Sequence, residues 1–358
     1  MMIDLQSLPR YDRHQTYEWN YEHAPDPVRL EVIEVPGEWH FCGLPVPSPL
    51  GMPAGPLLNG RWCLYYASLG FDVLTYKTVR SGTRTCYALP NLQPVECGPL
   101  FGGEVDLSAS ESMLGSWAVS YGMPSRDPDD WRADIEQTRQ QLPVEKVLSV
   151  SVVGTIQEGW SIDDLAADYA QCAHWAKESG ADCVETNFSC PNVSTCDGQL
   201  FQQPADSQVV TQAVRDAIGN LPYIAKIGRI QQREDAEALL AAVHESVDAL
   251  AMTNSIAATV VEADGSLLFD GERRGICGAV TLQASVEQTA MLAELIEQRQ
   301  YQLELVGVGG AGCWPDVQSY LQAGAMAVHI ATAGMVTPST AWEIRQQMVA
   351  ESRKSVGP

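Results

Sequence analysis

Four side chains that can do chemistry lie close together in residues 185–193. Asn187 and Asn192 carry amides, Ser189 carries a hydroxyl and Cys190 carries a thiol. An amide donates and accepts hydrogen bonds, so two amides beside a thiol suit a planar, polar heterocycle. A thiol with a suitable pKa acts as a base or a nucleophile. The alternative is a polar turn beside a small, inert cysteine of the core.

Further polar side chains follow other segments that have the pattern of strands: Lys77, Lys226, Asn254 and Ser255. A buried lysine is costly unless it is paired. Beside a flavin, a lysine would stabilise the negative charge of the reduced ring. The alternative for each lysine is a surface position at the rim of the fold, where its aliphatic part packs on apolar residues and its ammonium group stays in water.

A glycine-rich stretch, residues 307–312, follows a predicted strand and precedes a predicted helix. Gly309 and Gly310 would let backbone N–H groups approach a phosphate, and the N-terminus of the helix that follows favours an anion. Ala331 and Thr332, after the next strand, would complete such a site. A plain turn between strand and helix is the alternative.

The elements that would position these groups alternate along the chain from residue 49 onward. Eight strands are predicted at residues 49–54, 71–78, 147–153, 182–185, 223–227, 249–253, 303–308 and 327–331. Helices are predicted at residues 61–68, 131–141, 162–178, 208–218, 233–245, 285–298, 314–323 and 339–349. This alternation predicts an α/β fold, a (β/α)₈ TIM barrel. In that barrel the site lies at the C-terminal ends of the strands, where the polar residues above fall.

The barrel is predicted as a single domain over residues 49–350. Residues 1–48 are predicted as an N-terminal extension that packs across one end of the barrel. Two long stretches, residues 80–128 and 254–280, are predicted as irregular insertions at the C-terminal face.

Composition excludes several kinds of partner. The 358 residues include 45 acidic and 22 basic side chains, giving a net charge of -23, so neither nucleic acid nor an anionic membrane is expected to bind. No signal sequence or long apolar run is visible, which predicts a cytoplasmic protein. The ten cysteines form no C-x-x-C pair, so no metal or iron–sulfur cluster is expected.

The chain resembles the dihydroorotate dehydrogenases, most closely the class 1 members, which use a cysteine base. Residues 187–193 match the family signature, and cysteine at 190 is typical of the soluble class 1 branch rather than the membrane-associated class 2 branch. The segments that contain Lys77, Lys226, Asn254, Gly278, Gly309 and Thr332 match the family in the same order. The resemblance covers roughly residues 48–336.

The resemblance implies that FMN lies across the barrel mouth and that dihydroorotate is oxidised to orotate. Cys190 would take the C5 proton while a hydride passes from C6 to flavin N5. The implied catalytic residues are Cys190 and Lys77, and the implied substrate-binding residues are Asn187, Ser189, Asn192, Asn254 and Ser255. The implied cofactor-binding residues are Ala54, Gly55, Lys77, Thr78, Asn187, Lys226, Asn254, Gly278, Gly309, Gly310, Ala331 and Thr332.

The resemblance also implies a homodimer, with a small-molecule substrate and an electron acceptor as partners. The class 1A subgroup uses fumarate as acceptor, whereas class 1B passes electrons to NAD through an iron–sulfur subunit. One position departs from the family: Val119 stands where the family has an asparagine that contacts the substrate. An alternative is therefore a family member that oxidises or reduces a C–C bond in another small amide or pyrimidine. A flavin-binding protein with an inactive site is the non-enzymatic alternative.

Overall fold

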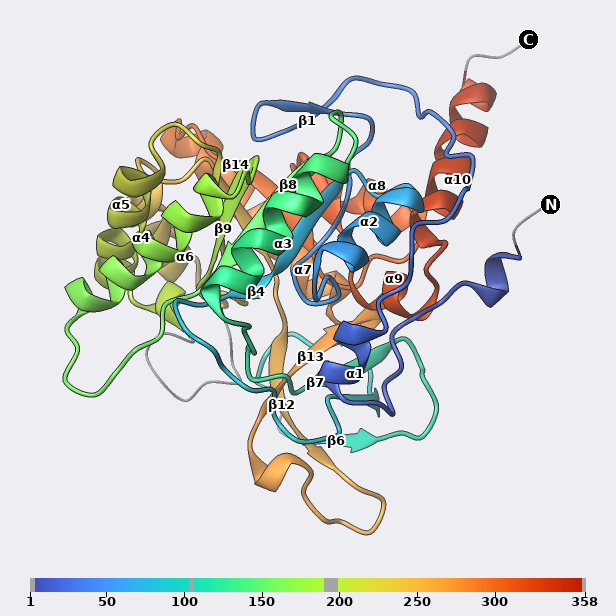
Figure 1. Ribbon diagram of the computed structural model, residues 1–358, viewed down its shortest axis with the longest axis horizontal. Helices are drawn as coiled ribbons and strands as arrows, with labels where there is room; N and C mark the ends of the chain where they lie inside the picture. Colours follow the sequence, from blue (N-terminus) through green and yellow to red (C-terminus); the bar gives the residue numbers. More distant parts are fainter. Residues whose placement is uncertain (1–3, 104–105, 190–198, 356–358) are drawn as a thin grey trace.

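Eight parallel strands close into a barrel at the centre of the molecule (Figure 1). The structure is a computed structural model that describes residues 4–103, 106–189 and 199–355. The barrel strands are β3 (Leu50–Met52), β4 (Val73–Val79), β8 (Val147–Val152), β9 (Cys183–Asn187), β10 (Tyr223–Lys226), β11 (Ala249–Met252), β14 (Glu304–Val308) and β15 (Ala327–His329). Their order around the barrel is their order in the chain, and β15 pairs with β3 to close it. The predicted (β/α)₈ barrel is confirmed.

Helices follow the strands and cover the outside of the barrel. They are α2 (Gly60–Ser68), α3 (Pro128–Gln141), α4 (Ile162–Glu178), α5 (Pro204–Ile218), α6 (Arg233–Val243), α7 (Leu282–Arg299), α8 (Trp314–Gln322), α9 (Thr332–Val336) and α10 (Thr340–Ser355). Local side chains define several of their first turns. Asn59 accepts a hydrogen bond from the N–H of Trp62, and Ser161 and Asp164 form a reciprocal capping box.

The two insertions form a second, smaller sheet instead of the irregular structure expected from the sequence. Its strands are β5 (Leu92–Glu96), β6 (Asp106–Ala109), β7 (Ser116–Val119), β12 (Ile256–Val261) and β13 (Arg274–Gly278), and they also close on one another. Each strand is short, and β7 pairs with β13 from the other insertion, Trp117 opposite Cys277. The pairing therefore depends on contacts between distant segments. This small sheet lies over the C-terminal face of the barrel because the two insertions that form it follow the C-terminal ends of β4 and β11.

The segment before the barrel runs from one end of it to the other. Near the small sheet it forms α1 (Tyr17–Glu22), which Figure 1 shows beside β7 and β13. At the opposite end it forms a hairpin of β1 (Trp39–Phe41) and β2 (Leu44–Val46). The Phe41 ring stacks on His329 inside the barrel, with 5.6 Å between ring centroids. Residues 4–48 thus contact both the site end and the floor of the barrel.

An apolar layer fills the barrel at its floor. Its members come from the barrel strands and the hairpin: Phe41, Val46, Val73, Val147, Cys183, Ile224, Ala249, Ala251, Val306 and Ala327. Within the described residues, no helix is long and apolar enough to cross a membrane.

Candidate active site

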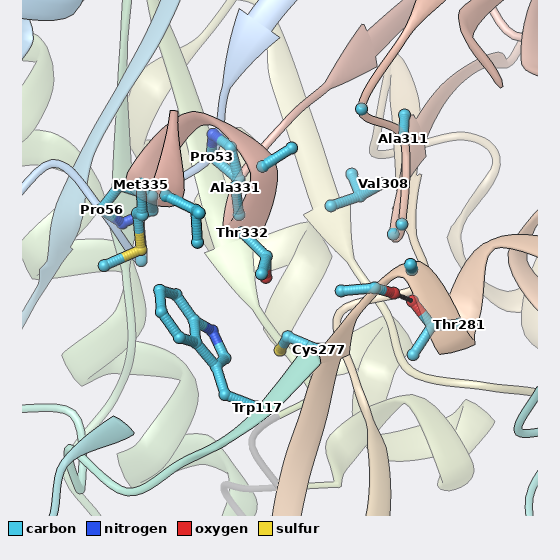
Figure 2. A pocket seen from close by; sticks show the side chains of 18 of the residues that line it. Pro53, Pro56, Trp117, Cys277, Thr281, Val308, Ala311, Ala331, Thr332 and Met335 are labelled. Atoms are coloured by element: carbon cyan, nitrogen blue, oxygen red, sulfur yellow. Dashed lines mark hydrogen bonds between the residues drawn. The ribbon is translucent and has the colours of Figure 1, made fainter. Parts of the chain in front are cut away.

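A cavity with a volume of about 440 Å³ lies between the C-terminal ends of the barrel strands and the small sheet. Figure 2 shows it bounded by Trp117 and Cys277 of the small sheet and by Val308, Ala331 and Thr332 of the barrel. The two sides differ in chemistry. Glycines and polar groups lie at or just after the C-terminal ends of β10, β11, β14 and β15, whereas large apolar side chains come from the insertions and from the segments after β3 and β15. This asymmetry suits a ligand that has both an anionic and a flat, apolar part.

The glycines after β14 present backbone donors to this cavity. In the described part of the chain, the N–H groups of Gly309 and Gly310 donate to no backbone or side-chain acceptor. Gly310 has a φ of +80°, and an added Cβ would lie 2.7 Å from the backbone nitrogen of Leu282, so a larger residue does not fit there. Backbone N–H groups held in such a turn form a binding site for an anion.

The start of α8 does not contribute to this anion site as the sequence predicted. The N–H groups of Gly312 and Cys313 already donate to Asp316, at 2.9 and 3.2 Å. The Asp316 carboxylate therefore occupies the N–H groups of the two residues that directly precede its helix. An incoming anion is left with Gly309, Gly310 and the neighbouring Thr332, which also lines the cavity.

Lys226 is the basic residue among the described residues that line this cavity. It is the last residue of β10 and is only 4% exposed. A buried ammonium group requires a negative partner, because removing it from water is costly. Lys226 therefore attracts an electron-rich ligand to the barrel side of the cavity.

Asn187, Ser189 and Asn254 form one hydrogen-bonded group beside the cavity. The side-chain oxygen of Asn187 accepts from the N–H and the hydroxyl of Ser189, at 3.1 and 3.3 Å. The Asn254 amide donates to the carbonyl oxygen of Ser189 at 3.3 Å. The ends of β9 and β11 are thereby tied together. This group holds the residue that precedes Cys190 in a fixed place.

Lys77 lies behind the cavity wall formed by Tyr121. Its ammonium group is 5.7 Å from the centroid of the Tyr121 ring, and the side chain is 6% exposed. Tyr121 in turn packs edge-on against Tyr11 and Tyr17, at centroid distances of 6.1 and 5.9 Å. The N-terminal segment thus supports the position of an aromatic ring that faces both the cavity and Lys77.

Most of the predicted site residues lie at this face. They fall into three groups: residues that line the main cavity, residues that are buried next to it, and residues outside the described part of the chain. Those that line the main cavity are Gly55, Lys226, Asn254, Ser255, Gly278, Gly309, Gly310, Ala331 and Thr332. Ala54, Lys77, Thr78 and Asn187 are buried next to it without lining it. The predicted Cys190 and Asn192 lie outside the described residues.

A second cavity of about 460 Å³ meets the first at Ser255, which lines both. It contains Ser189, the last described residue before Cys190, together with Arg229 and Arg273. Thr78, buried next to the main cavity, has its hydroxyl 3.0 Å from that of Ser151. The described residues contain no group of three His, Cys, Asp or Glu side chains that would hold a metal ion.

Sequence reasoning missed the apolar side of the cavity. Its members come from the insertions and from the segments after β3 and β15: Pro53, Pro56, Leu92, Met113, Trp117, Tyr121, Met335 and Val336. Residues 256–261 of β12 are mostly apolar and rich in β-branched residues, which is typical of a strand, but they do not alternate between apolar and polar residues. Which of these residues face a ligand depends on how β7 and β13 pair. This pairing joins distant segments, so no local sequence pattern predicts it.

The fold and the cavity define a class of protein: (β/α)₈ barrels with an anion site and a buried lysine at the C-terminal mouth. Within that class, a sequence model of the dihydroorotate dehydrogenase family matches residues 105–351. The match spans well over half of the chain, which therefore belongs to the dihydroorotate dehydrogenase family, a family of oxidoreductases.

Individual relatives agree with this assignment. The dihydroorotate dehydrogenase of Dictyostelium discoideum is 29% identical over 92% of this chain and 95% of its own length. The catalytic subunit of dihydroorotate dehydrogenase B (NAD(+)) from Desulforudis audaxviator is 29% identical over 45% of this chain and 51% of its own. A crystal structure of an Eimeria tenella enzyme of this name, in complex with ferulenol, has the same fold. It matches with a TM-score of 0.74 at 16% identity, over 94% of this chain and 90% of that one.

Proposed function

We propose that this chain binds FMN in the main cavity and oxidises dihydroorotate to orotate. The observation that carries the proposal is the joint placement of free backbone donors at Gly309 and Gly310 and the buried Lys226 on one side of a cavity whose other side is apolar. A flavin mononucleotide needs these three environments: donors for its phosphate, a cation near its polar ring edge and an apolar surface for its ring system.

The residues that would hold FMN follow from this placement. Gly309, Gly310 and Thr332, with Ala331 beside them, would bind the phosphate. Lys226 and Lys77 would contact the ring system, and Ala54, Gly55, Thr78 and Gly278 would lie along its edges. When bound, FMN supplies the acceptor for the hydride that leaves C6 of the substrate.

The substrate would lie between the flavin and the hydrogen-bonded group of Asn187, Ser189 and Asn254. With Ser255 and Asn192, these side chains supply amides and hydroxyls for a pyrimidine ring and its carboxylate. Cys190 would take the proton from C5. The support for Cys190 and Asn192 is the sequence motif and the position of Ser189 directly before them.

Further parts of the proposal rest on family membership. The protein is proposed to act as a cytoplasmic homodimer over a single barrel domain, residues 49–350, with a small-molecule electron acceptor, for which fumarate is the first candidate. Neither nucleic acid nor a membrane is a proposed partner. Light scattering tests the dimer: a monomer at micromolar concentration contradicts it.

An anaerobic visible spectrum of the purified protein tests the function directly. We expect a yellow protein whose flavin absorbance is bleached when dihydroorotate is added and restored by fumarate. A colourless protein that takes up no FMN contradicts the cofactor. A yellow protein that dihydroorotate does not bleach contradicts the substrate and favours a different small amide or pyrimidine.

Two thiols compete for the role of the base, and substitution separates them. Cys277 lines the cavity, and its thiol donates to the carbonyl oxygen of Asn254 at 3.6 Å. We expect Cys190→Ala to keep FMN bound but to abolish its reduction by substrate, while Cys277→Ala, the matched control, is still reduced. Reduction that survives in Cys190→Ala and is lost in Cys277→Ala would assign the base to Cys277.

A further inference from the structure

A layer of polar side chains lies inside the barrel, beneath the cavity. Side chains alternate along a strand, so residues two positions beyond the apolar floor also point inward. Thr75 follows Val73 in this way, and Glu185 follows Cys183. With Ser149 and His329, they form what we call the inner polar layer, in which no side chain is more than 1% exposed. Barrels of this type usually fill such a layer with branched apolar residues.

Glu185 is the acidic member of the inner polar layer. Neither of its carboxyl oxygens forms a hydrogen bond with any described residue. Asp72 is the other buried acidic side chain in the described ranges, and it is paired with Lys146 and Arg345. Polar groups with no partner are rare in protein interiors, so each one requires an explanation.

Lys226 is the cation nearest to Glu185 by strand register. Glu185 on β9 lies opposite Ile224 on β10, and Lys226 is two residues further along the same strand on the same inward face. Diagonal neighbours of this kind lie within reach of long side chains. Lys226 also lines the main cavity, so it stands between Glu185 and the ligand.

The electrostatics of the layer agree with this geometry. Burial raises the pKa of Glu185, and the charge of Lys226 and, after it, the hydroxyl of Ser151 on the neighbouring strand oppose that rise. Burial, together with the charge of Lys226, lowers the pKa of His329 to about 3, so this histidine is neutral and supplies no competing positive charge. Lys226 is therefore the cation that faces the buried carboxyl group.

We propose that Glu185 is the counter-charge of Lys226 and, through it, sets how strongly the site stabilises a reduced flavin. This inference rests on the proposed function, because it takes a flavin as the ligand of Lys226. A cation beside the ring favours the added negative charge of the reduced state. A carboxylate on the far side of that cation offsets part of its charge. Glu185 is thus a positioning residue that acts on the flavin without touching it.

The test is the midpoint potential of the bound flavin in Glu185→Gln, a substitution that keeps the shape and removes the charge. We expect the equilibrium constant for two-electron reduction to rise roughly tenfold, which corresponds to about 30 mV in the positive direction. Ser149→Ala, a neighbour in the same layer without charge, is the matched control and should leave the potential unchanged. The same potential in Glu185→Gln and in the wild type overturns the inference.

A double-mutant cycle shows whether Lys226 transmits the effect. In a Lys226→Met background, Glu185→Gln should no longer change the potential, because the cation that it balances is gone. A shift of full size in that background overturns the role of Lys226. If FMN binds and the cycle shows no coupling, only this inference fails; if the wild type binds no flavin, the proposed function fails with it.

A measurement on the wild type covers the case in which Glu185→Gln does not fold. Reduction of the flavin should change the infrared absorption of a buried carboxyl group, since Lys226 then interacts with a second negative charge. A carboxyl region that is identical before and after reduction overturns the inference.

Discussion

Single side chains decide what the cavity accepts, and Val119 is the clearest case. It lies at the end of β7, where it pairs with Leu92 and Gly275, and its side chain lines the main cavity. The family has a substrate-binding asparagine at this position. The valine adds to the apolar side of the cavity formed with Trp117, and on the proposed function it would leave one polar group of the substrate without a partner.

Restoring the amide tests which substrate the cavity is built for. If dihydroorotate is the substrate, Val119→Asn should raise kcat/KM for it on the order of tenfold, since a buried polar group left unpaired costs about 1–3 kcal/mol. Val119→Leu, which has about the size of asparagine without its amide, is the control and should change little. Steady-state kinetics with both variants provide the comparison, and a lower kcat/KM in Val119→Asn would favour a different substrate.

At the scale of elements, the site depends on two segments outside the barrel repeat. The small sheet supplies one side of the cavity, and the segment before the barrel supports that sheet through Tyr11 and Tyr17. At the other end of the molecule, α10 is fastened to the barrel floor. Arg345 donates to the carbonyl oxygens of Gly70 and Ile33, both at 2.8 Å, and is paired with Asp72.

Removing the Tyr17 ring should weaken both the fold and the site. Tyr17 is 4% exposed, so Tyr17→Ala leaves a hole behind Tyr121 and should lower the free energy of unfolding by about 3–5 kcal/mol. Turnover should fall as well, because Lys77 loses a fixed neighbour. Trp19→Ala on the same helix removes a ring that is 38% exposed and serves as the control. Both variants are examined by chemical denaturation and by turnover assays. Wild-type turnover in Tyr17→Ala would show that the N-terminal segment does not support the site.

Breaking the buried ion pair of α10 should destabilise the protein without altering the site directly. Arg345→Met leaves the fully buried Asp72 with Lys146 as its remaining basic partner and should cost about 3–5 kcal/mol. Arg353→Met changes an exposed arginine in the same helix and should cost little. Urea denaturation of both variants gives the two values; equal stability would show that the ion pair contributes nothing.

At the scale of the whole molecule, a barrel closed by eight parallel strands holds the polar groups from β9, β10, β11 and β14 at one mouth. The strongly acidic composition contrasts with this site, where Lys226 and backbone donors favour negative charge. Net charge affects solubility and long-range attraction, whereas local donors decide what binds at short range. An anionic cofactor is therefore compatible with a net charge of -23.

On the proposed function, FMN binding should stabilise the entire fold, because only the folded chain forms the site. At a free concentration of about 100 times its Kd, the gain is about 2.7 kcal/mol, which for a chain of this length raises Tm by about 4 °C. Riboflavin, which lacks the phosphate, should raise Tm less at the same concentration. Thermal unfolding with each flavin distinguishes them, and an equal rise would argue against a phosphate site at Gly309 and Gly310.

The sequence by itself determined the barrel and the order of the groups at its mouth. The barrel strands were predicted within a few residues because each combines a short apolar run with a helix after it, and α4 was predicted with the bounds that it has. These are local patterns, set by the spacing of neighbouring residues. Because strand ends in this fold carry the site, the positions of Lys226, Asn254 and Gly309 followed from the same patterns.

Only the tertiary structure decided the small sheet, the apolar side of the cavity and the environment of Glu185. The pairing of β7 with β13 joins residues 116–119 to residues 275–278, and Glu185 comes to face Lys226 only because β9 and β10 are neighbours in a closed barrel. The start of α8 is a further example. The glycine-rich sequence predicted that its N–H groups would bind an anion, but those of Gly312 and Cys313 donate to Asp316. Contacts between distant segments depend on the closure of the whole fold, and the residues on either side of a single position do not encode them.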